Sequence, residues 1–139
     1  YMGFFKVCMF LVLSQFSNEC PLGWVHFQNS CYLFSNYKVT WFEASVRTVI
    51  CIHTKYHRSY ILYAFSFKDF WLGARDDIIE GTWMWSADDS ALSYTDWSTA
   101  EPNDEGGDED CMELSGDHNW QWNDAHCRTF VINFICEKA

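Results

Sequence analysis

The chain has 139 residues, which is a usual length for a single domain. Its 19 Asp and Glu outnumber its 9 Lys and Arg, and the net charge of −10 argues against nucleic acid as a partner because phosphate binding requires a basic surface. Aromatic residues make up 19% of the chain, far more than disordered proteins contain, and no apolar run reaches the ~18–20 residues of a membrane-spanning helix.

The first 17 residues have the pattern of a secretory signal peptide. Lys6 precedes an apolar stretch from Val7 to Leu13, and Ser17 is a small residue before the polar segment that starts at Asn18. We therefore expect cleavage after Ser17, export from the cell and a single domain over residues 18–139. The alternative is a buried N-terminal strand.

Export would leave six cysteines, namely Cys20, Cys31, Cys51, Cys111, Cys127 and Cys136. An even number of cysteines in an oxidising compartment indicates disulfide bonds, and the absence of a C-x-x-C pair argues against a thiolate zinc site. The spacing alone does not choose among the possible pairings. If Cys111 and Cys127 are bonded, they close a loop of about 16 residues and contribute roughly 3 kcal/mol in the chain-entropy model.

The predicted elements change in character along the chain. Residues 30–34 alternate and are rich in aromatic side chains, as in a strand, and Thr40 with Glu43 forms a capping-box pattern that predicts the start of a helix. Aromatic residues near helical spacing predict a second helix from residue 54. Short apolar segments at 70–72, 83–85 and 111–112 then predict short strands joined by long loops. Residues 86–110 form the longest of these loops, and loops of this length are usually functional.

Six carboxylates within ten residues crowd the end of that loop. They are Glu101, Asp104, Glu105, Asp108, Glu109 and Asp110. One interpretation is a solvated acidic run. However, Trp97 and Cys111 flank this run, and a second polar pair, Asn123 and Asp124, follows closely. Carboxylate and amide oxygens suit Ca²⁺, which takes 6–8 oxygen ligands, better than octahedral Mg²⁺. The EF-hand pattern is absent.

Several motifs in a particular order resemble the C-type lectin-like domain over residues 20–139, and the chain is similar to secreted perlucin-like lectins of molluscs. The motifs are Cys20-Pro21-Leu22-Gly23-Trp24, Trp41 with Glu43-Ala44, Trp71-Leu72-Gly73, Glu101-Pro102-Asn103, Glu109-Asp110-Cys111, Trp122-Asn123-Asp124-Ala125-His126-Cys127 and Phe134-Ile135-Cys136-Glu137. The resemblance implies an α+β double-loop fold with two helices, two small antiparallel sheets and a long calcium-binding loop region.

The same resemblance implies three disulfide bonds, Cys20–Cys31, Cys51–Cys136 and Cys111–Cys127. Cys51 stands three residues beyond Thr48, the position where the family usually has this cysteine. The resemblance also implies a cis peptide bond before Pro102, an isomer that non-proline residues almost never adopt.

Two calcium sites are implied by matching motifs. The principal, sugar-binding ion would be held by Glu101, Asn103, Glu109, Asn123 and Asp124, with Asp124 using both its side chain and its backbone carbonyl. An auxiliary ion would be held by Asp76, Glu80, Asp104, Glu109 and Asp110. No catalytic residue is implied.

A carboxylate, an amide and a shared cation can together satisfy one sugar hydroxyl, which offers one proton and two lone pairs. Glu101 with Asn103, and Glu109 with Asn123, would provide two such pairs for vicinal hydroxyls. The resemblance connects the Glu-Pro-Asn order with equatorial 3- and 4-hydroxyls, as in mannose and N-acetylglucosamine, whereas Gln-Pro-Asp would imply galactose. A single shallow site binds at about millimolar concentration, so a homo-oligomer would supply avidity.

Innate recognition of glycans is the role that the resemblance suggests. An acidic, biomineral-associated matrix protein is the alternative, and a glycoside hydrolase is disfavoured because Ca²⁺ would keep the acids ionised.

His53 and His57 have the spacing of a zinc pair on a helix but lack a third ligand, and His126 is interpreted as a structural neighbour of the site. Most of the tryptophans at 71, 83, 85, 97, 120 and 122 are expected in the core.

Overall fold

The computed structural model describes residues 20–27, 29–47 and 69–138. It contains one helix and seven strands in these ranges: β1 (Val25–Phe27), β2 (Ser30–Phe34), α1 (Trp41–Arg47), β3 (Phe70–Arg75), β4 (Met84–Trp85), β5 (Cys111–Ser115), β6 (Gln121–Ala125) and β7 (Asn133–Lys138). The predicted signal peptide, the predicted second helix and the His53/His57 pair fall outside the described residues. Among those residues, no helix is both long and apolar enough to cross a membrane.

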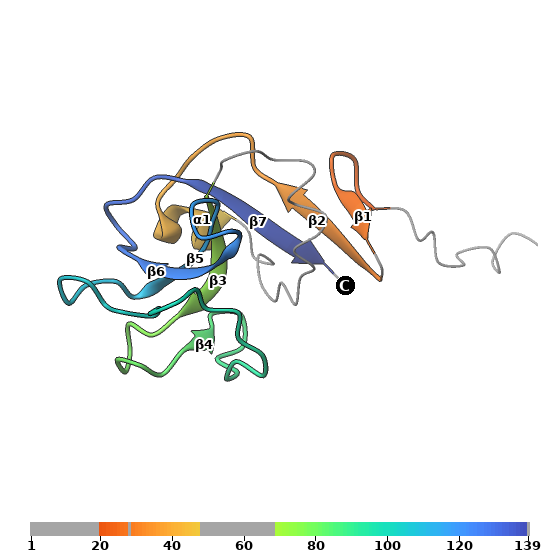
Figure 1. Cartoon of the computed structure of the whole chain (residues 1–139). Helices are drawn as coiled ribbons and strands as arrows, with labels where there is room; N and C mark the ends of the chain where they lie inside the picture. The colour runs from red at the N-terminus through yellow and green to blue at the C-terminus, as the bar shows by residue number, and fades with distance from the viewer. Residues whose placement is uncertain (1–19, 28, 48–68, 139) are drawn as a thin grey trace, which may run out of the picture.

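The sheet runs in the order β1-β2-β7-β3-β5-β6, and β4 pairs with β3 (Figure 1). β1, β2 and β7 are antiparallel neighbours, as are β4, β3, β5 and β6. A short parallel pairing of Phe70 with Asn133 and of Trp71 with Phe134 joins the two groups. The α+β fold with two small antiparallel groups of strands is confirmed, and the short parallel β3–β7 contact joins these groups into one mixed sheet.

The capping box predicted at the start of the helix is confirmed. The backbone N–H of Thr40 donates to Glu43 Oε2 at 3.0 Å, and the N–H of Glu43 donates to Thr40 Oγ1 at 3.3 Å. These bonds satisfy two of the N–H groups that a helix N-terminus leaves without intrahelical partners. The helix that follows covers β3, where Trp41 Nε1 donates to the Leu72 carbonyl at 2.8 Å and Trp71 Nε1 donates to the Val39 carbonyl at 2.9 Å.

Tryptophans form much of the core, as predicted. Five of the six named above are at most 8% exposed, namely Trp71, Trp83, Trp85, Trp120 and Trp122. Trp97 is half-buried and packs against the core cluster that contains the last four of these. Trp122 lies edge-on to both Trp97 and Tyr94, at ring-centroid distances of 5.6 and 5.7 Å. Large rings thus give a sheet of short strands enough apolar contact to support the long loops.

The long loop over residues 86–110 is tied to the sheet at its middle. Trp122 N–H donates to the Asp96 carbonyl and Ser98 N–H donates to the Trp122 carbonyl, both at 2.9 Å, so this part of the loop lies along β6. Three residues later the chain reaches Glu101. The loop is therefore held beside β6 immediately before the acidic run begins.

Candidate functional site

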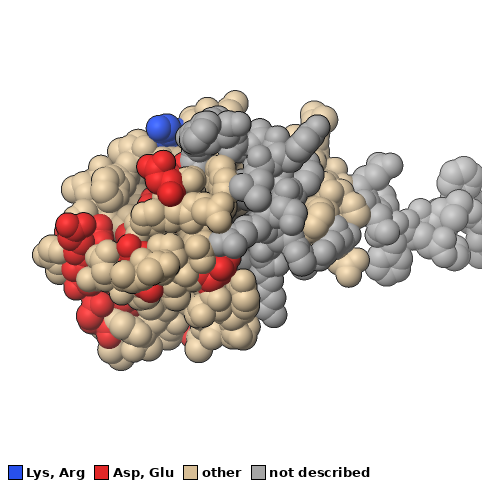
Figure 2. Space-filling model, viewed as in Figure 1, with Lys and Arg blue, Asp and Glu red and all other residues tan. Residues whose placement is uncertain are grey.

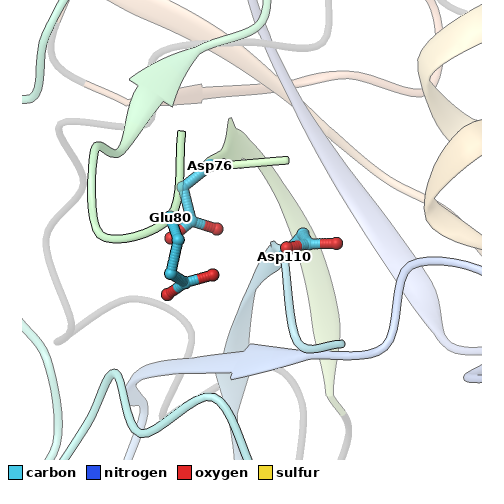
Figure 3. A group of neighbouring side chains, drawn as sticks. All are labelled: Asp76, Glu80 and Asp110. Carbon is cyan, nitrogen blue, oxygen red and sulfur yellow. The ribbon is translucent and has the colours of Figure 1, made fainter. Parts of the chain in front are cut away.

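Three carboxylates predicted for the auxiliary ion meet at the end of β3. One oxygen from each of Asp76, Glu80 and Asp110 lies within 4.8 Å of the others. Asp76 and Glu80 come from the loop after β3, whereas Asp110 comes from the turn into β5 (Figure 3). Asp76 N–H donates to the Asp110 carbonyl at 3.1 Å, which joins the two segments. The tertiary structure thus gathers three negative charges that repel one another without a cation.

Asp76 is the most buried member, with 2% of its surface exposed. Its Oδ2 accepts from Gly81 N–H at 2.9 Å, but its Oδ1 is buried and has no hydrogen-bond partner. Burial, followed by the charges of Glu80, Asp110 and Asp124, raises the pKa of Asp76 to about 6. A buried carboxylate oxygen without a donor is costly unless a cation compensates it, so this oxygen fits a hard metal ion.

The two other predicted auxiliary ligands lie in the adjoining loop. Asp104 is near enough to raise the pKa values of both Glu80 and Asp110, although burial is the larger cause for each. Its Oδ1 accepts from Glu109 N–H at 3.1 Å, and Glu109 Oε2 accepts from Glu105 N–H at 3.0 Å. Asp104 and Glu109 are therefore neighbours of the three-carboxylate group without belonging to its tightest part.

Asp124 connects the acidic loop to β6. Its side chain is 1% exposed, and its two carboxylate oxygens accept from the backbone N–H groups of Asn103, at 3.2 Å, and Asp104, at 2.7 Å. These charge-assisted bonds bring two segments about twenty residues apart into one site. Asp124 is thereby held against the acidic run.

Glu101 lies beside this carboxylate. Burial, followed by the neighbouring Asp124 and Glu109 charges, raises the pKa of Glu101, while His118 lowers it. Glu101 Oε2 is buried and has no hydrogen-bond partner. Burial, and after it the charge of Asp124, also raises the pKa of Glu109. The peptide bond between Glu101 and Pro102 is cis, as the resemblance implied. These carboxylate oxygens, among them the unpartnered Glu101 Oε2, fit Ca²⁺.

Asn123, the last member of the predicted principal set, lies next to Asp124 on β6. Its Nδ2 donates to Glu113 Oε1 at 3.0 Å and to the Asp124 carbonyl at 2.7 Å. Asn103 enters the site through its backbone, and its side chain is exposed. The structure thus brings Glu101, Asn103, Glu109 and Asp124 together around the acidic loop, with Asn123 alongside.

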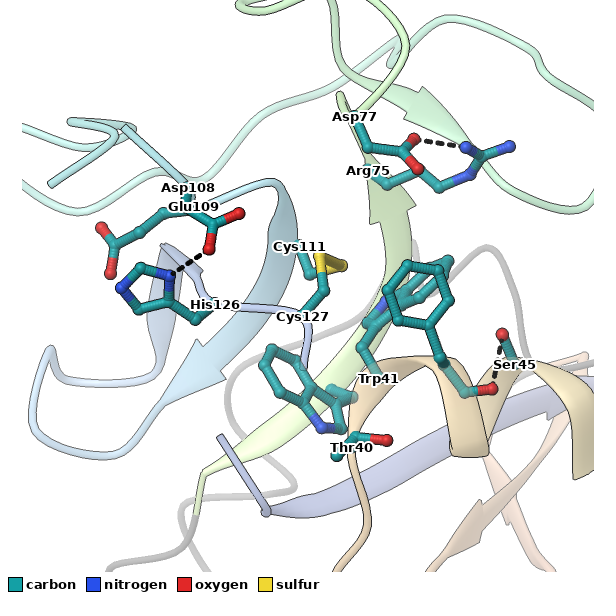
Figure 4. The surroundings of a disulfide bond; sticks show 12 residues. Thr40, Trp41, Ser45, Arg75, Asp77, Asp108, Glu109, Cys111, His126 and Cys127 are labelled. Carbon is teal, nitrogen blue, oxygen red and sulfur yellow. Dashed lines mark hydrogen bonds and ion pairs between the residues drawn. A yellow bond between two sulfur atoms is a disulfide. The ribbon is translucent and has the colours of Figure 1, made fainter. Parts of the chain in front are cut away.

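Two disulfide bonds implied by the resemblance are confirmed. Cys20–Cys31 ties the N-terminal hairpin, and Cys111–Cys127 links β5 to the segment after β6, with a Cα–Cα distance of 5.2 Å (Figure 4). The third pairing stays a prediction because Cys51 lies outside the described residues; Cys136 is itself disulfide-bonded.

His126 Nδ1 lies 3.4 Å from Asp108 Oδ2, and the His126 ring packs against Phe130.

Removing the Cys111–Cys127 bond, by changing both cysteines to alanine, is expected to lower the free energy of unfolding by about 3 kcal/mol. The bond constrains a loop of 16 residues in the unfolded chain. Urea denaturation of the variant and of wild type measures the difference. Changing Cys20 and Cys31, which are 11 residues apart, is the matched control and should cost slightly less. An unchanged urea midpoint would contradict the prediction.

Glu113 and His118 belong to the neighbourhood of the site and carry no sequence signal of their own. Glu113 faces Asn123 only because β5 pairs with β6. His118 Nδ1 lies 3.1 Å from Ser98 Oγ, in a turn that is brought next to Glu101. Recognising either residue in advance would have required the register of β5 against β6.

The mixed sheet, the tethered long loop and the oxygen-rich site define a C-type lectin fold. A profile of the Lectin C-type domain matches residues 44–138, more than half of the chain. The chain therefore belongs to the C-type lectin domain family.

Particular relatives agree with this membership. The chain is 36% identical to perlucin of Haliotis laevigata over 86% of its own length and 83% of that protein. It is 35% identical to the low affinity immunoglobulin epsilon Fc receptor of Mus musculus over 87% of its length, but spans only 38% of that receptor. Among solved structures, it resembles the cow CD23 carbohydrate-recognition domain in the presence of a GlcNAc2Man3 oligosaccharide, with 30% identity, a TM-score of 0.72 and coverage of 86% and 95% of the two chains.

Proposed function

We propose that this chain is a secreted, calcium-dependent, carbohydrate-binding lectin with mannose and N-acetylglucosamine specificity, acting in the recognition of glycans. The observation that carries the proposal is the buried Asp124 carboxylate, which binds the backbone of Asn103 and Asp104. Through it, carboxylates and amides from two distant segments share one site. The two disulfide bonds support a location in an oxidising compartment.

The proposed principal ligands are Glu101, Asn103, Glu109, Asn123 and Asp124, and the proposed auxiliary ligands are Asp76, Glu80, Asp104, Glu109 and Asp110. A bound Ca²⁺ would supply a positive centre for the lone pairs of two sugar hydroxyls. The carboxylates of Glu101 and Glu109 would accept the hydroxyl protons, and the exposed amide of Asn103 would donate to a remaining lone pair. Asn123 would contribute its Oδ1, because both of its N–H groups already donate to Glu113 and to the Asp124 carbonyl. The protein would therefore place hydrogen-bond acceptors and donors around the two sugar hydroxyls.

The type of sugar follows from the order of residues around the cis peptide bond. Glu101 precedes Pro102 and Asn103 follows it, the order that the resemblance connects with equatorial 3- and 4-hydroxyls. The cow CD23 domain was solved in the presence of an oligosaccharide of mannose and N-acetylglucosamine, which supports the same class of ligand. One such site binds weakly, at about millimolar concentration, and a homo-oligomer would provide avidity.

A second candidate function is supported by the charge of the surface. Asp and Glu side chains gather over one side of the visible face, and the whole chain carries a net charge of −10 (Figure 2). Such a face could bind calcium carbonate as a biomineral matrix protein does, without a saccharide. A hydrolase is not proposed, because a cation in the site would keep the carboxylates ionised and unable to donate protons.

Affinity chromatography tests the lectin proposal. The protein is expected to be retained on mannose-agarose in calcium, to elute with EDTA or free methyl mannoside, and to pass through galactose-agarose. Retention that neither EDTA nor mannoside reverses would contradict the proposal. Binding to calcium carbonate crystals without retention on mannose-agarose would favour the matrix protein instead.

A pair of variants sharpens this experiment. Glu101→Ala removes a proposed ligand and should abolish retention, whereas Glu105→Ala removes the same charge from an exposed neighbour in the same loop and should leave retention unchanged. Equal retention of the two variants would show that general acidity, rather than the proposed ligand set, binds the column.

A further inference from the structure

Glu113 is a half-buried carboxylate in the middle of the sheet. It lies on β5 directly opposite Asn123 on β6, and on its other side β5 pairs with β3 at Trp71. Its Oε1 accepts a hydrogen bond from Asn123 Nδ2 at 3.0 Å. The proposed ligand set does not include Glu113, but the Glu113 carboxylate contacts Asn123, which is a member of that set.

The surroundings of Glu113 are unfavourable for an acid. Burial raises the pKa of Glu113 to about 7, and the charges of Asp69, Glu109 and Asp117 act in the same direction, while the Asn123 hydrogen bond opposes them. Burying a carboxylate costs free energy unless a cation or hydrogen-bond donors compensate its charge. Local departures of this kind occur at functional sites, where a polar contact serves the site rather than stability.

The chemistry of an amide explains what the contact achieves. A side-chain amide has two N–H donors on one end and a carbonyl oxygen on the other. Asn123 Nδ2 donates to Glu113 Oε1 and to the Asp124 carbonyl, at 3.0 and 2.7 Å. Turning the amide over would place its oxygen against the Glu113 carboxylate, and two acceptors repel each other. Glu113 and the Asp124 carbonyl, both acceptors, therefore favour the same one of the two orientations of the amide and leave Oδ1 directed away from Glu113.

We propose that Glu113 is a positioning residue of the lectin site, which accepts a hydrogen bond from Asn123 and thereby sets the end of the Asn123 amide that is available as a ligand. The inference rests on the proposed function, because it assigns Glu113 a role through one of the proposed ligands. Glu113 itself would neither bind the ion nor touch the sugar.

Two substitutions separate hydrogen bonding from shape. Glu113→Met keeps the length of the side chain but removes the acceptor, whereas Glu113→Gln keeps an acceptor oxygen. In calorimetric titration with methyl mannoside at saturating calcium, Glu113→Met is expected to bind about tenfold more weakly, in line with the loss of one hydrogen bond to the site. Glu113→Gln should stay within about threefold of wild type. Thermal unfolding of both variants checks that they fold.

A second measurement requires neither calcium nor sugar. In the ion-free protein, the NMR signals of the Asn123 side-chain N–H₂ group should show slow hydrogen exchange in wild type and Glu113→Gln, and fast exchange in Glu113→Met. Unchanged exchange in Glu113→Met, or equal loss of mannoside affinity in the Gln and Met variants, would overturn the inference.

The two proposals fail in distinguishable ways. If wild type binds no mannoside in calcium, the proposed function is wrong, and the amide exchange data alone then decide whether Glu113 holds Asn123. If wild type binds mannoside and the Met variant binds it equally well, only the role of Glu113 is wrong.

Discussion

Asp124→Ala is expected to abolish calcium-dependent sugar binding and to lower the free energy of unfolding in calcium by about 2–4 kcal/mol. The side chain is 1% exposed, and its loss leaves the N–H groups of Asn103 and Asp104 without their acceptor. A buried donor left unsatisfied costs about 1–3 kcal/mol. The acidic loop would also lose its connection to β6, so the ligands from the two segments would no longer be held together.

Two comparison variants identify the cause. Asp124→Asn keeps the shape and one acceptor oxygen, so it should lose less stability than Asp124→Ala but still fail to bind the principal calcium ion, because the charge is gone. Asp117→Ala removes an exposed acid from the turn between β5 and β6 and should change neither property. Mannoside and calcium titrations with urea denaturation provide the measurements. Normal mannoside binding by Asp124→Ala would refute the proposed site.

Acidification is expected to stabilise the ion-free protein and to weaken the effect of calcium. Burial raises the pKa of Asp76 to about 6 and that of Glu113 to about 7, and burial also raises the pKa values of Glu101 and Glu109. Carboxyl groups with a higher pKa in the folded state hold protons more tightly than in the unfolded chain. Folding in EDTA is therefore favoured as the pH falls from about 8 toward 5.

Calcium reverses this dependence, because metal binding requires deprotonated ligands. The increase in melting temperature on adding calcium should be large at pH 7.5 and much smaller near pH 5, and mannoside affinity should fall over the same range. Differential scanning calorimetry with EDTA or calcium, at several pH values, measures both effects. A melting temperature that falls in EDTA between pH 7.5 and 5, or a calcium effect independent of pH, would contradict the prediction.

Features that depend on neighbours in the chain were predictable. The capping box of Thr40 and Glu43 needs only a spacing of three residues, and the helix starts where the spacing predicts. The long loop before Cys111 was evident from its composition. The cis bond before Pro102 and the two described disulfide bonds followed from resemblance, since neither spacing nor composition chose among pairings.

Other features were missed because their causes are distant in the sequence. No pattern in the sequence predicts β1 or β7, or the parallel contact of β3 with β7 that joins the two groups of strands. Such short strands carry little periodic signal, and their pairing depends on partners up to a hundred residues away. The role assigned to Glu113 likewise depends on the register of β5 with β6.

The order of the residues establishes which chemical groups the chain contains: the acidic run, the Glu-Pro-Asn and Trp-Asn-Asp motifs and the cysteines that flank them. Which oxygens face each other depends on the folded chain, because the Asp124 carboxylate contacts the acidic loop through the backbone N–H groups of Asn103 and Asp104, which no motif singles out. The fold also buries Asp76 Oδ1 and Glu101 Oε2 without partners. The burial of these carboxylates and the distances between their oxygens depend on the fold and not on neighbouring residues in the sequence. Together they make the acidic residues a site that fits a cation.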